Sequence, residues 1–586
     1  MKKKMSLLLV IMLMTVTFLA ACSGGGQTAE QPSQGEQTEQ TEGNGENTET
    51  PPAEEGVESE GYFEAQDPSK NPQTALSRTD TLIVGMTAPK GVFNPLYWQT
   101  AYDRYVVDTL FDAWTVLNDD GTYSNRLAES IEVSEDKLKY TFKLKKGVTY
   151  SDGSPVTVKD FAFALKVLHD PSYDGQSDIF TTHIVGGQDY HDGKADEISG
   201  INIIDDHTIE ITVTEATAMT KDDLATIRFM PESYYGKDYK FGELGYMTEL
   251  HDKPIGSGQY ILKDFKPGQE VVMEANPNYF LGAPKIKNLI YKTTTEETRL
   301  AMLQSGEVDV DMISVNEDSV AEVMGMGFMD LNLFRTNGYG YVAMNHESPK
   351  FQDKKVRQAL MYGLNRSEIV EIIYGPYANV LNIPQSNLSW SYSDEGIEPY
   401  EFDQEKAKQL LDEAGWVVGA DGIREKDGVK FEIDFSATAD NPVIDAMIPI
   451  MTKNYQDLGI TVKAEMLDFN AIMDKKDRGD FEMFFAAWGL TPDPDSTVYK
   501  TDGQQNDLGY SNPEYDAAMQ EGLKAFDLEE RKVAYAKSYQ ILNEDVPALL
   551  IYQRRDGWAI NSRIKGLDIT PYKNFTLELY KVEIEQ

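Results

Sequence analysis

The sequence predicts an α/β protein with more than one lobe, and three observations support that fold class. Strand-like runs alternate with helix-like runs along the chain, as in proteins that mix the two kinds of element in one architecture. The chain has 586 residues, which is enough for two or three domains, and no internal repeat divides it. A large hydrophobic core must stabilise the protein, because a single cysteine permits no disulfide within the chain.

The N-terminus carries a secretory signal. Three lysines at positions 2–4 precede an apolar stretch that is short for a membrane-spanning helix of about 20 residues. Leu19-Ala20-Ala21-Cys22 then resembles the lipobox of bacterial lipoproteins. The resemblance implies that residues 1–21 are removed and that a diacylglycerol is attached to Cys22. The alternative is an ordinary signal peptide with a cysteine placed by chance.

An acidic, polar segment follows the cysteine. Residues 23–69 contain twelve acidic residues and no Lys or Arg, and most of the others are polar or small. Such a composition buries too little apolar surface to fold. We therefore expect residues 22–78 to form a disordered tether between the membrane and the globular body. The alternative is an acidic tail that binds a ligand.

Short periodic runs predict the strands of the body. Residues 81–86 form an apolar run that ends near a glycine, which is typical of a buried strand. Residues 138–145 alternate between apolar and polar side chains, which predicts a half-buried strand closed by a turn over 151–155. Further strands are expected at 209–213, 270–274 and 288–292.

Capping residues predict the helices. Asp403 precedes an apolar stripe that ends before Gly415, so the two residues mark the start and the end of one helix. Asp353 is the expected N-cap of another helix. Residues 365–368 have the spacing of a capping box and open a third.

Charge excludes one class of function. The formal net charge is −43, from 54 basic and 97 acidic residues. A face that binds nucleic acid needs an excess of basic side chains, so we expect no nucleic-acid partner. The acidity is consistent with a soluble protein at an exposed location, and it does not identify a ligand.

A series of short motifs runs in order through the body. Gly256-Ser257-Gly258-Gln259-Tyr260, for example, has the form G-[TS]-G-x-Y, and Ala414-Gly415-Trp416 ends another motif. The segments of the series are 139–148, 151–157, 160–161, 256–260, 276–280, 299–309, 357–360, 407–416, 493–495 and 510–513. Together they resemble the motifs of family 5 extracellular solute-binding proteins, which serve oligopeptide and dipeptide ABC importers.

The resemblance implies a periplasmic-binding-protein type II fold, with two lobes joined by a hinge of two crossings and a subdomain inserted in lobe I. Mapped on this chain, lobe I comprises residues 79–113, 200–297 and 553–586. The inserted subdomain comprises residues 114–199, and lobe II comprises residues 298–552.

The resemblance also implies function. The protein would be the lipid-anchored, monomeric binding component of an ABC importer, held on the outer face of the cytoplasmic membrane of a Gram-positive cell. It would enclose extracellular oligopeptides by hinge closure and deliver them to permease subunits with their ATPase, without a cofactor. Members of the family also bind oligosaccharides, nickel complexes, haem or opines, and these ligands stay open as alternatives.

Two loops are expected at the ligand-binding cleft, because ligands of open α/β sheets bind beyond the carboxyl ends of strands. The first loop follows the strand at 81–86. The second follows the strand-like run at 481–488, where two prolines stop the ladder. The candidate ligand-binding residues in the two loops are Asn94, Tyr97, Trp98, Trp488, Leu490, Asp493 and Asp495.

Two of these residues have competing interpretations. Trp488 is either a core residue or a platform for the ligand. Asp493 either contacts a ligand ammonium or braces its own loop by accepting backbone hydrogen bonds. Peptide-binding relatives often carry an acid at the position of Leu490, which pairs with the peptide α-amino group. Leucine there predicts that a free peptide N-terminus is not required.

Two further candidates come from the resemblance alone. Trp390 lies in a region that faces the cleft in relatives, and Asn345 is a weaker candidate. No arginine is assigned to a ligand carboxylate.

An extracellular hydrolase is the rival class. Asp493 and Asp495 are only two residues apart, which does not match a glycosidase carboxylate pair. The chain contains no G-x-S-x-G or H-E-x-x-H motif, and its six histidines show no zinc-ligand spacing. The sequence therefore predicts a binding protein without catalytic or metal-ligating residues.

Overall fold

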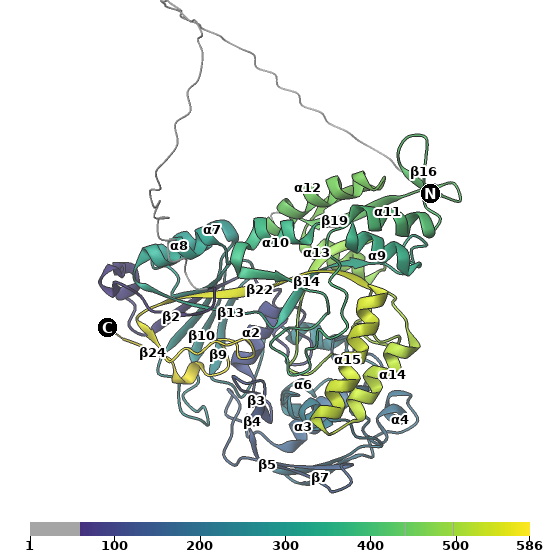
Figure 1. Cartoon of the computed structure of the whole chain (residues 1–586). Helices are drawn as coiled ribbons and strands as arrows, with labels where there is room; N and C mark the ends of the chain where they lie inside the picture. The colour runs from purple at the N-terminus through teal and green to yellow at the C-terminus, as the bar shows by residue number, and fades with distance from the viewer. Residues whose placement is uncertain (1–58, 440, 496, 586) are drawn as a thin grey trace, which may run out of the picture. The chain divides into compact units, whose positions relative to one another are not determined.

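The computed structural model describes residues 59–439, 441–495 and 497–585 (Figure 1). The predicted signal peptide, Cys22 and the tether as far as residue 58 lie outside the described residues. No helix in the described ranges combines the length and the apolar character needed to cross a membrane.

A large mixed sheet organises the body. Its main path runs in the following order: β20 (Thr461–Leu467), β19 (Glu432–Thr438), β21 (Met483–Gly489), β14 (Gly338–Met344), β22 (Ala548–Asn561), β12 (Val310–Ile313), β2 (Thr81–Met86), β11 (Asn288–Thr293), β10 (Glu270–Ala275) and β9 (Tyr260–Lys266). The short strands β1 (Gly61–Phe63), β13 (Met329–Arg335) and β15 (Ala378–Val380) pair beside this path.

Strand β22 connects the two halves of this sheet. Its first half pairs with β14 and β15, and its second half pairs with β12 and β13. Nearly all of its side chains are buried, as expected for a central strand covered on both faces. The view in Figure 1 shows it in yellow, running from the half with β19 and β14 to the half with β2.

Helices cover the half of the sheet that contains β19 to β22. They are α9 (Lys354–Tyr362), α10 (Arg366–Tyr374), α11 (Gln404–Glu413), α12 (Pro442–Asp457) and α13 (Phe469–Asp477). The three caps predicted from sequence are present: Asp353, Asn365 and Asp403 accept from backbone N–H groups in the first turns of α9, α10 and α11. Gly415 follows α11 with φ of 85°, as a C′ glycine does.

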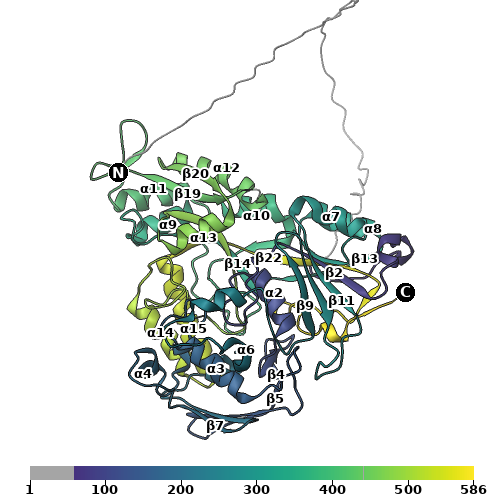
Figure 2. The ribbon, with the colours of Figure 1, turned by 180° about the vertical axis from the view of Figure 1, so that it is seen from behind.

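Two long helices form a hairpin after β21. They are α14 (Pro513–Lys524) and α15 (Leu528–Asp545). Figures 1 and 2 both show this hairpin next to α3 (Val158–Leu168) and α4 (Gly187–His191). Ala218 donates a backbone hydrogen bond to the Leu523 carbonyl at 2.9 Å, which fixes the tip of α14 against that region.

A second, four-stranded antiparallel sheet packs against α3. Its order is β5 (Ala128–Val133), β6 (Lys139–Leu144), β8 (Thr208–Thr212) and β7 (Ile201–Asp205). The alternation predicted over 138–145 is confirmed, because Tyr140, Phe142 and Leu144 are buried while the residues between them are not. The inward side chains join Trp114 and Phe161 in one aromatic core.

The predicted boundary at residue 200, between the inserted subdomain and lobe I, divides the strands of this sheet. Strands β7 and β8 follow that boundary, yet they pair within the same sheet as β5 and β6. Buried side chains as far along the chain as Met247 belong to the same hydrophobic cluster. The reason is that the Ile209 and Ile211 alternation matches the inward face of β6, so β7 and β8 pack with residues that the prediction assigns to the inserted subdomain. The remaining lobe boundaries stay predictions.

The predicted end of the tether also needs correction. Residues 61–63 form β1, which pairs with β13, and Tyr62 donates a 2.8 Å hydrogen bond to Asp330. Ala65 donates its backbone N–H to the same carboxylate. The acidic composition hides this short Gly-Tyr-Phe strand, whose Phe63 packs against the main core. Residues 59–78 therefore belong to the body.

Candidate functional site

The loop that follows β21, residues 490–495, is called the β21 loop below. The ladder between β21 and β14 places Trp488 opposite Tyr339 and Gly489 opposite Gly338. Beyond the ladder, Leu490 donates its N–H to the Asn337 carbonyl at 2.8 Å, and the Asn337 side chain donates to the Leu490 carbonyl at 2.9 Å. The loop therefore leaves the sheet at a fixed point.

A cavity of about 20 Å³ lies beside the β21 loop, which is room for about one water molecule. Its lining is mostly aromatic and apolar, with one carboxylate. The lining residues are Tyr339, Pro384, Gln385, Trp488, Leu490, Pro494, Asp495, Val498, Tyr499, Tyr515, Met519, Tyr539 and Leu542. We call this space the tyrosine cavity. It brings together three of the residues predicted from sequence, namely Trp488, Leu490 and Asp495.

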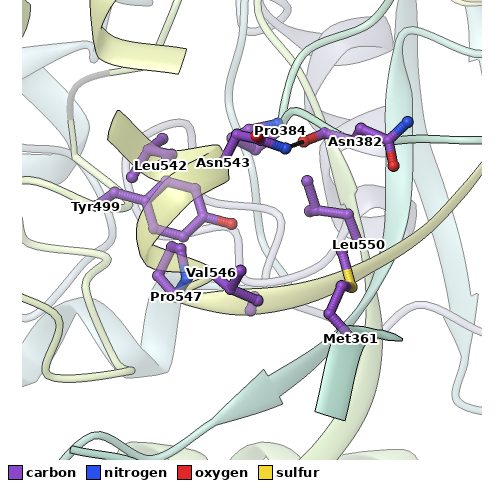
Figure 3. A pocket seen from close by; sticks show the side chains of 10 residues that line it. Met361, Asn382, Pro384, Tyr499, Leu542, Asn543, Val546, Pro547 and Leu550 are labelled. Carbon is purple, nitrogen blue, oxygen red and sulfur yellow. Dashed lines mark hydrogen bonds between the residues drawn. The ribbon is translucent and has the colours of Figure 1, made fainter. Parts of the chain in front are cut away.

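A smaller cavity of about 10 Å³ lies next to it (Figure 3). The two share Pro384, Tyr499 and Leu542. Most of the smaller cavity is apolar, and Asn543 closes one side by donating its amide to the Asn382 carbonyl at 3.0 Å. The two cavities are therefore neighbouring spaces that share part of their lining.

Arg531 of α15 braces the β21 loop. Its guanidinium forms an ion pair with Asp493 and lies 4.7 Å from the ring centroid of Trp390. It also donates to the Tyr535 hydroxyl and to the Gly522 carbonyl. The Asp493 carboxylate is therefore held by a cation from helix α15 and not by backbone N–H groups of its own loop. Burial raises the pKa of Asp493, and the charge of Arg531 offsets part of that rise.

Asp495, two residues on, has different partners. One carboxylate oxygen accepts from the Thr497 N–H at 2.7 Å and from the Thr497 hydroxyl at 2.6 Å. No ion pair with Asp495 is present in the part of the chain that the structure describes. The second carboxylate oxygen is left without a hydrogen-bond donor there.

An acidic pair faces the β21 loop from helix α5 (Thr220–Ala225). Burial and the charges of Asp222, Asp493 and Asp495 raise the pKa of Asp223 to about 7. No cation or hydrogen-bond donor pairs with the Asp223 carboxylate in the described ranges. Because Asp222 pairs with Lys221 at 3.0 Å, the unpaired negative charge where α5 and the β21 loop meet is that of Asp223 and Asp495.

The loop that follows β2, residues 87–98, is called the β2 loop, and its predicted site residues lie in packed surroundings. Asn94 is fully buried and accepts from the Leu96 N–H at 3.0 Å, which braces its own turn. Tyr97 packs against the rings of Tyr173 and His251. Trp98 is half-buried, with the guanidinium of Arg104 5.3 Å from its ring centroid. None of the three lines either cavity.

Asn345 lies at the opposite end of β14 from the β21 loop. Its amide donates to the Phe481 carbonyl at 2.9 Å, and its carbonyl oxygen accepts from the Glu347 N–H. The side chain therefore braces the chain where β21 begins, away from the tyrosine cavity.

Sequence reasoning missed most of the aromatic lining. Tyr339, Tyr499, Tyr515 and Tyr539 come from four separate segments. A signal exists on α15, where Arg531, Tyr535 and Tyr539 are spaced four residues apart and so share one helix face. Asp223 gives no such signal, because acidic residues are abundant along the chain.

The family model "Bacterial extracellular solute-binding proteins, family 5 Middle" matches residues 122–509. The oligopeptide-binding protein AppA of Bacillus subtilis is 28% identical over 514 residues, which span 86% of this chain and 90% of that protein. Heme-binding protein A of Haemophilus influenzae is 27% identical over 469 residues, which span 76% of this chain and 82% of that protein.

A solved structure is also similar. The structure of AppA from Bacillus subtilis in complex with a nonapeptide has a TM-score of 0.79 and 26% identity, and the match covers 88% of this chain and 100% of that one. The predicted fold class, the periplasmic-binding-protein type II fold of α/β architecture, is confirmed. In the ranges described by the structure, no group of three or more His, Cys, Asp and Glu residues is arranged to hold a metal ion.

Proposed function

Because the chain belongs to the family 5 bacterial extracellular solute-binding proteins, we propose that it is the lipid-anchored binding component of an ABC importer for oligopeptides. It captures peptides outside the cell and encloses them by closure of its lobes about the hinge. It then delivers them to permease subunits that an ATPase drives. The family consists of binding proteins, so no catalytic role is assigned.

The similarity to AppA in complex with a nonapeptide carries this proposal, because it extends over 88% of the chain. The site is compatible with a peptide. Extended peptides are held largely by backbone hydrogen bonds, and their side chains enter separate pockets. The β21 loop and the tyrosine cavity supply such a pocket through Trp488, Leu490 and Asp495. Trp390 and Asp493 remain proposed contributors to the ligand site, whereas Asn94, Tyr97, Trp98 and Asn345 are held in packed surroundings.

Membrane attachment through Cys22 is part of the proposal. The diacylglycerol and a tether would hold a monomer on the outer face of the cytoplasmic membrane, as expected in a Gram-positive cell. One acyl chain anchors only marginally, whereas two chains hold a protein stably. Labelling cells with an alkyne fatty acid should mark the wild-type protein, and Cys22→Ser should abolish both the label and the membrane fraction.

One relative favours a second candidate function. The similarity to Heme-binding protein A spans 76% of this chain, so a non-peptide solute is the alternative ligand. Native mass spectrometry of protein purified from peptide-rich medium tests both. We expect peptides of several residues to co-purify and to exchange with added peptide. Haem or another non-peptide solute in their place would overturn the peptide proposal.

A matched pair of variants locates the ligand. Trp488→Ala removes a half-buried side chain from the cavity lining, and we expect it to lower the amount of co-purified peptide. Val418→Ala is the control, because Val418 is 58% exposed on a short strand that lines neither cavity.

A further inference from the structure

The tyrosine cavity has an interior of buried phenol groups. Tyr339, Tyr499, Tyr515 and Tyr539 are each at most 4% exposed. The hydroxyls of Tyr339 and Tyr499 are 3.3 Å apart, longer than an ordinary O–H···O hydrogen bond, and each is the other's only partner in the described chain. The Tyr515 hydroxyl has no hydrogen-bond partner there, although the residue is 1% exposed.

The Tyr515 side chain lines the cavity and its hydroxyl makes no hydrogen bond to the described residues, so a group that enters the cavity can supply the missing partner. Asp495 is close enough for its charge to act on this group. Burial first, and then neighbouring phenols and the charge of Asp495, raise the pKa of Tyr515. The missing partner therefore lies in a field that favours a hydrogen-bond donor with positive charge.

The rim of the cavity adds the negative charge and an aromatic surface. Trp488, Leu490 and Asp495 are half-buried, whereas the tyrosines beneath them are buried. One oxygen of Asp495 is free of hydrogen-bond donors in the described residues. Asp493 differs, because Arg531 already neutralises it. Aromatic faces and a carboxylate around one small space are the recognition elements for an organic cation.

We infer that the tyrosine cavity is a subsite for the terminal ammonium of a lysine side chain in the bound peptide. This inference rests on the proposed function, because the ammonium belongs to a peptide ligand. Three N–H donors of the ammonium match the free oxygen of Asp495 and the buried phenol oxygens. The partly apolar rim at Leu490 and Trp488 suits the methylene stem.

Size selects the lysine ammonium over other cations. A cavity of about 20 Å³ admits a group the size of one water molecule, as an ammonium is. The planar guanidinium of arginine is larger. A peptide α-ammonium is attached to a branched carbon, which stops at the rim. An unbranched stem that ends in an ammonium is the group that reaches the buried phenols.

Calorimetry with positional peptide libraries tests the inference. The probes are pentapeptides of alanine that carry one lysine at each position in turn, the same peptides with neutral norleucine in its place, and Nα-acetylated forms of both. At one position we expect norleucine to weaken binding to the wild-type protein about tenfold or more. Acetylation of the α-amino group should change that affinity less than twofold.

Two conservative variants show which protein groups act. Asp495→Asn keeps an oxygen that can accept from Thr497 and removes the charge, and Tyr515→Phe removes only the hydroxyl. We expect both to lower the affinity for the lysine peptide more than the affinity for the norleucine peptide, and so to reduce the preference for lysine. Gln409→Ala, on the exposed face of α11, is the matched control and should keep the full preference.

The outcomes distinguish failure of the lysine subsite from failure of the proposed oligopeptide function. If lysine and norleucine peptides bind equally at every position, the subsite is overturned and the oligopeptide function stands. A preference that disappears on Nα-acetylation assigns the cation to the peptide N-terminus and also overturns the inference. If no pentapeptide binds and longer peptides also fail, the proposed function itself fails.

Discussion

The β2 loop and the β21 loop begin alike and end in opposite surroundings. Each follows the carboxyl end of a strand of the same sheet, and each carries polar side chains. The β2 loop is packed into the core, and its backbone donors are occupied: Gly91 and Val92 donate to Asp103, and Phe93 donates to the His251 carbonyl. The β21 loop instead borders a cavity.

The difference shows that the carboxyl end of a strand is necessary for such a site and not sufficient. The β2 loop turns directly into α2 (Ala101–Leu110), whose capping residue Asp103 is also its anchor. Prolines do not separate the two loops, because the β2 loop contains Pro89 and Pro95 and the β21 loop contains Pro492 and Pro494. Packing partners therefore decide which loop stays open to a ligand.

The largest expected effect comes from the brace of the β21 loop. Arg531→Met leaves the half-buried Asp493 carboxylate without its cation and removes the contact with Trp390. We expect a loss of about 3 kcal/mol in unfolding free energy, the lower end for breaking a buried ion pair, because Asp493 keeps some solvent contact. Chemical denaturation measures it.

The double variant with Asp493→Asn provides the control. Removing both charges should recover part of the loss, because the carboxylate no longer lacks a partner. If Arg531→Met alone is as stable as the wild type, the guanidinium does not brace the loop.

A substitution in the β2 loop should lower the unfolding free energy and leave the peptide affinity unchanged. Asn94→Ala leaves the buried Leu96 N–H without its acceptor, which costs about 2 kcal/mol. Peptide affinity at a temperature where the variant is folded should stay within twofold of the wild type. Strongly weakened binding by folded Asn94→Ala would contradict the contrast between the loops and return Asn94 to the ligand site.

Much of the fold could be predicted from local patterns. The alternation over 138–145 and the caps at Asp353 and Asp403 each depend on a few neighbouring residues, and all three are confirmed. Strand β1 was not predicted, because it forms by pairing with β13, a strand more than 260 positions away in the chain. The hydrogen bond from Tyr62 to Asp330 shows this long-range contact.

Of the residues that line the candidate site, only those in and next to the β21 loop could be predicted from the sequence. Trp488, Leu490 and Asp495 belong to one short motif, so sequence could group them. Tyr339 and Tyr515 join them through pairing of β14 with β21 and through packing of α14, which are long-range contacts. The sequence identifies Asp493 as a charged loop residue, but it does not reveal that its partner is Arg531 on helix α15.

Asp223 of α5 predicts a pH dependence of stability that links α5 to the β21 loop. The pKa of Asp223 rises from 3.8 to about 7, so the folded protein binds more protons than the unfolded chain between these values. Stability should therefore fall as the pH rises from about 4 to about 7.

Asp223→Asn removes that penalty. We expect the variant to be more stable than the wild type by about 1 kcal/mol at pH 8, well below the full value for three pKa units because solvent reaches this half-buried carboxylate. At pH 4 the two should be equal. Thermal unfolding across the pH range measures the difference, and a constant offset at every pH would exclude titration of Asp223 as its cause.

The smallest expected effect lies where the α14–α15 hairpin meets the segment between β8 and α5, outside both loops. Lys524 pairs with Glu215 at 2.9 Å, and both side chains are about half exposed. Exposed ion pairs contribute little, so Lys524→Ala should lower the unfolding free energy by less than about 0.5 kcal/mol, and 1 M salt should abolish the difference. The Ala218 to Leu523 backbone hydrogen bond stays in place in this variant. A loss as large as that of Arg531→Met would mean that the contact of the hairpin tip, and not the brace at Asp493, holds the β21 loop in place.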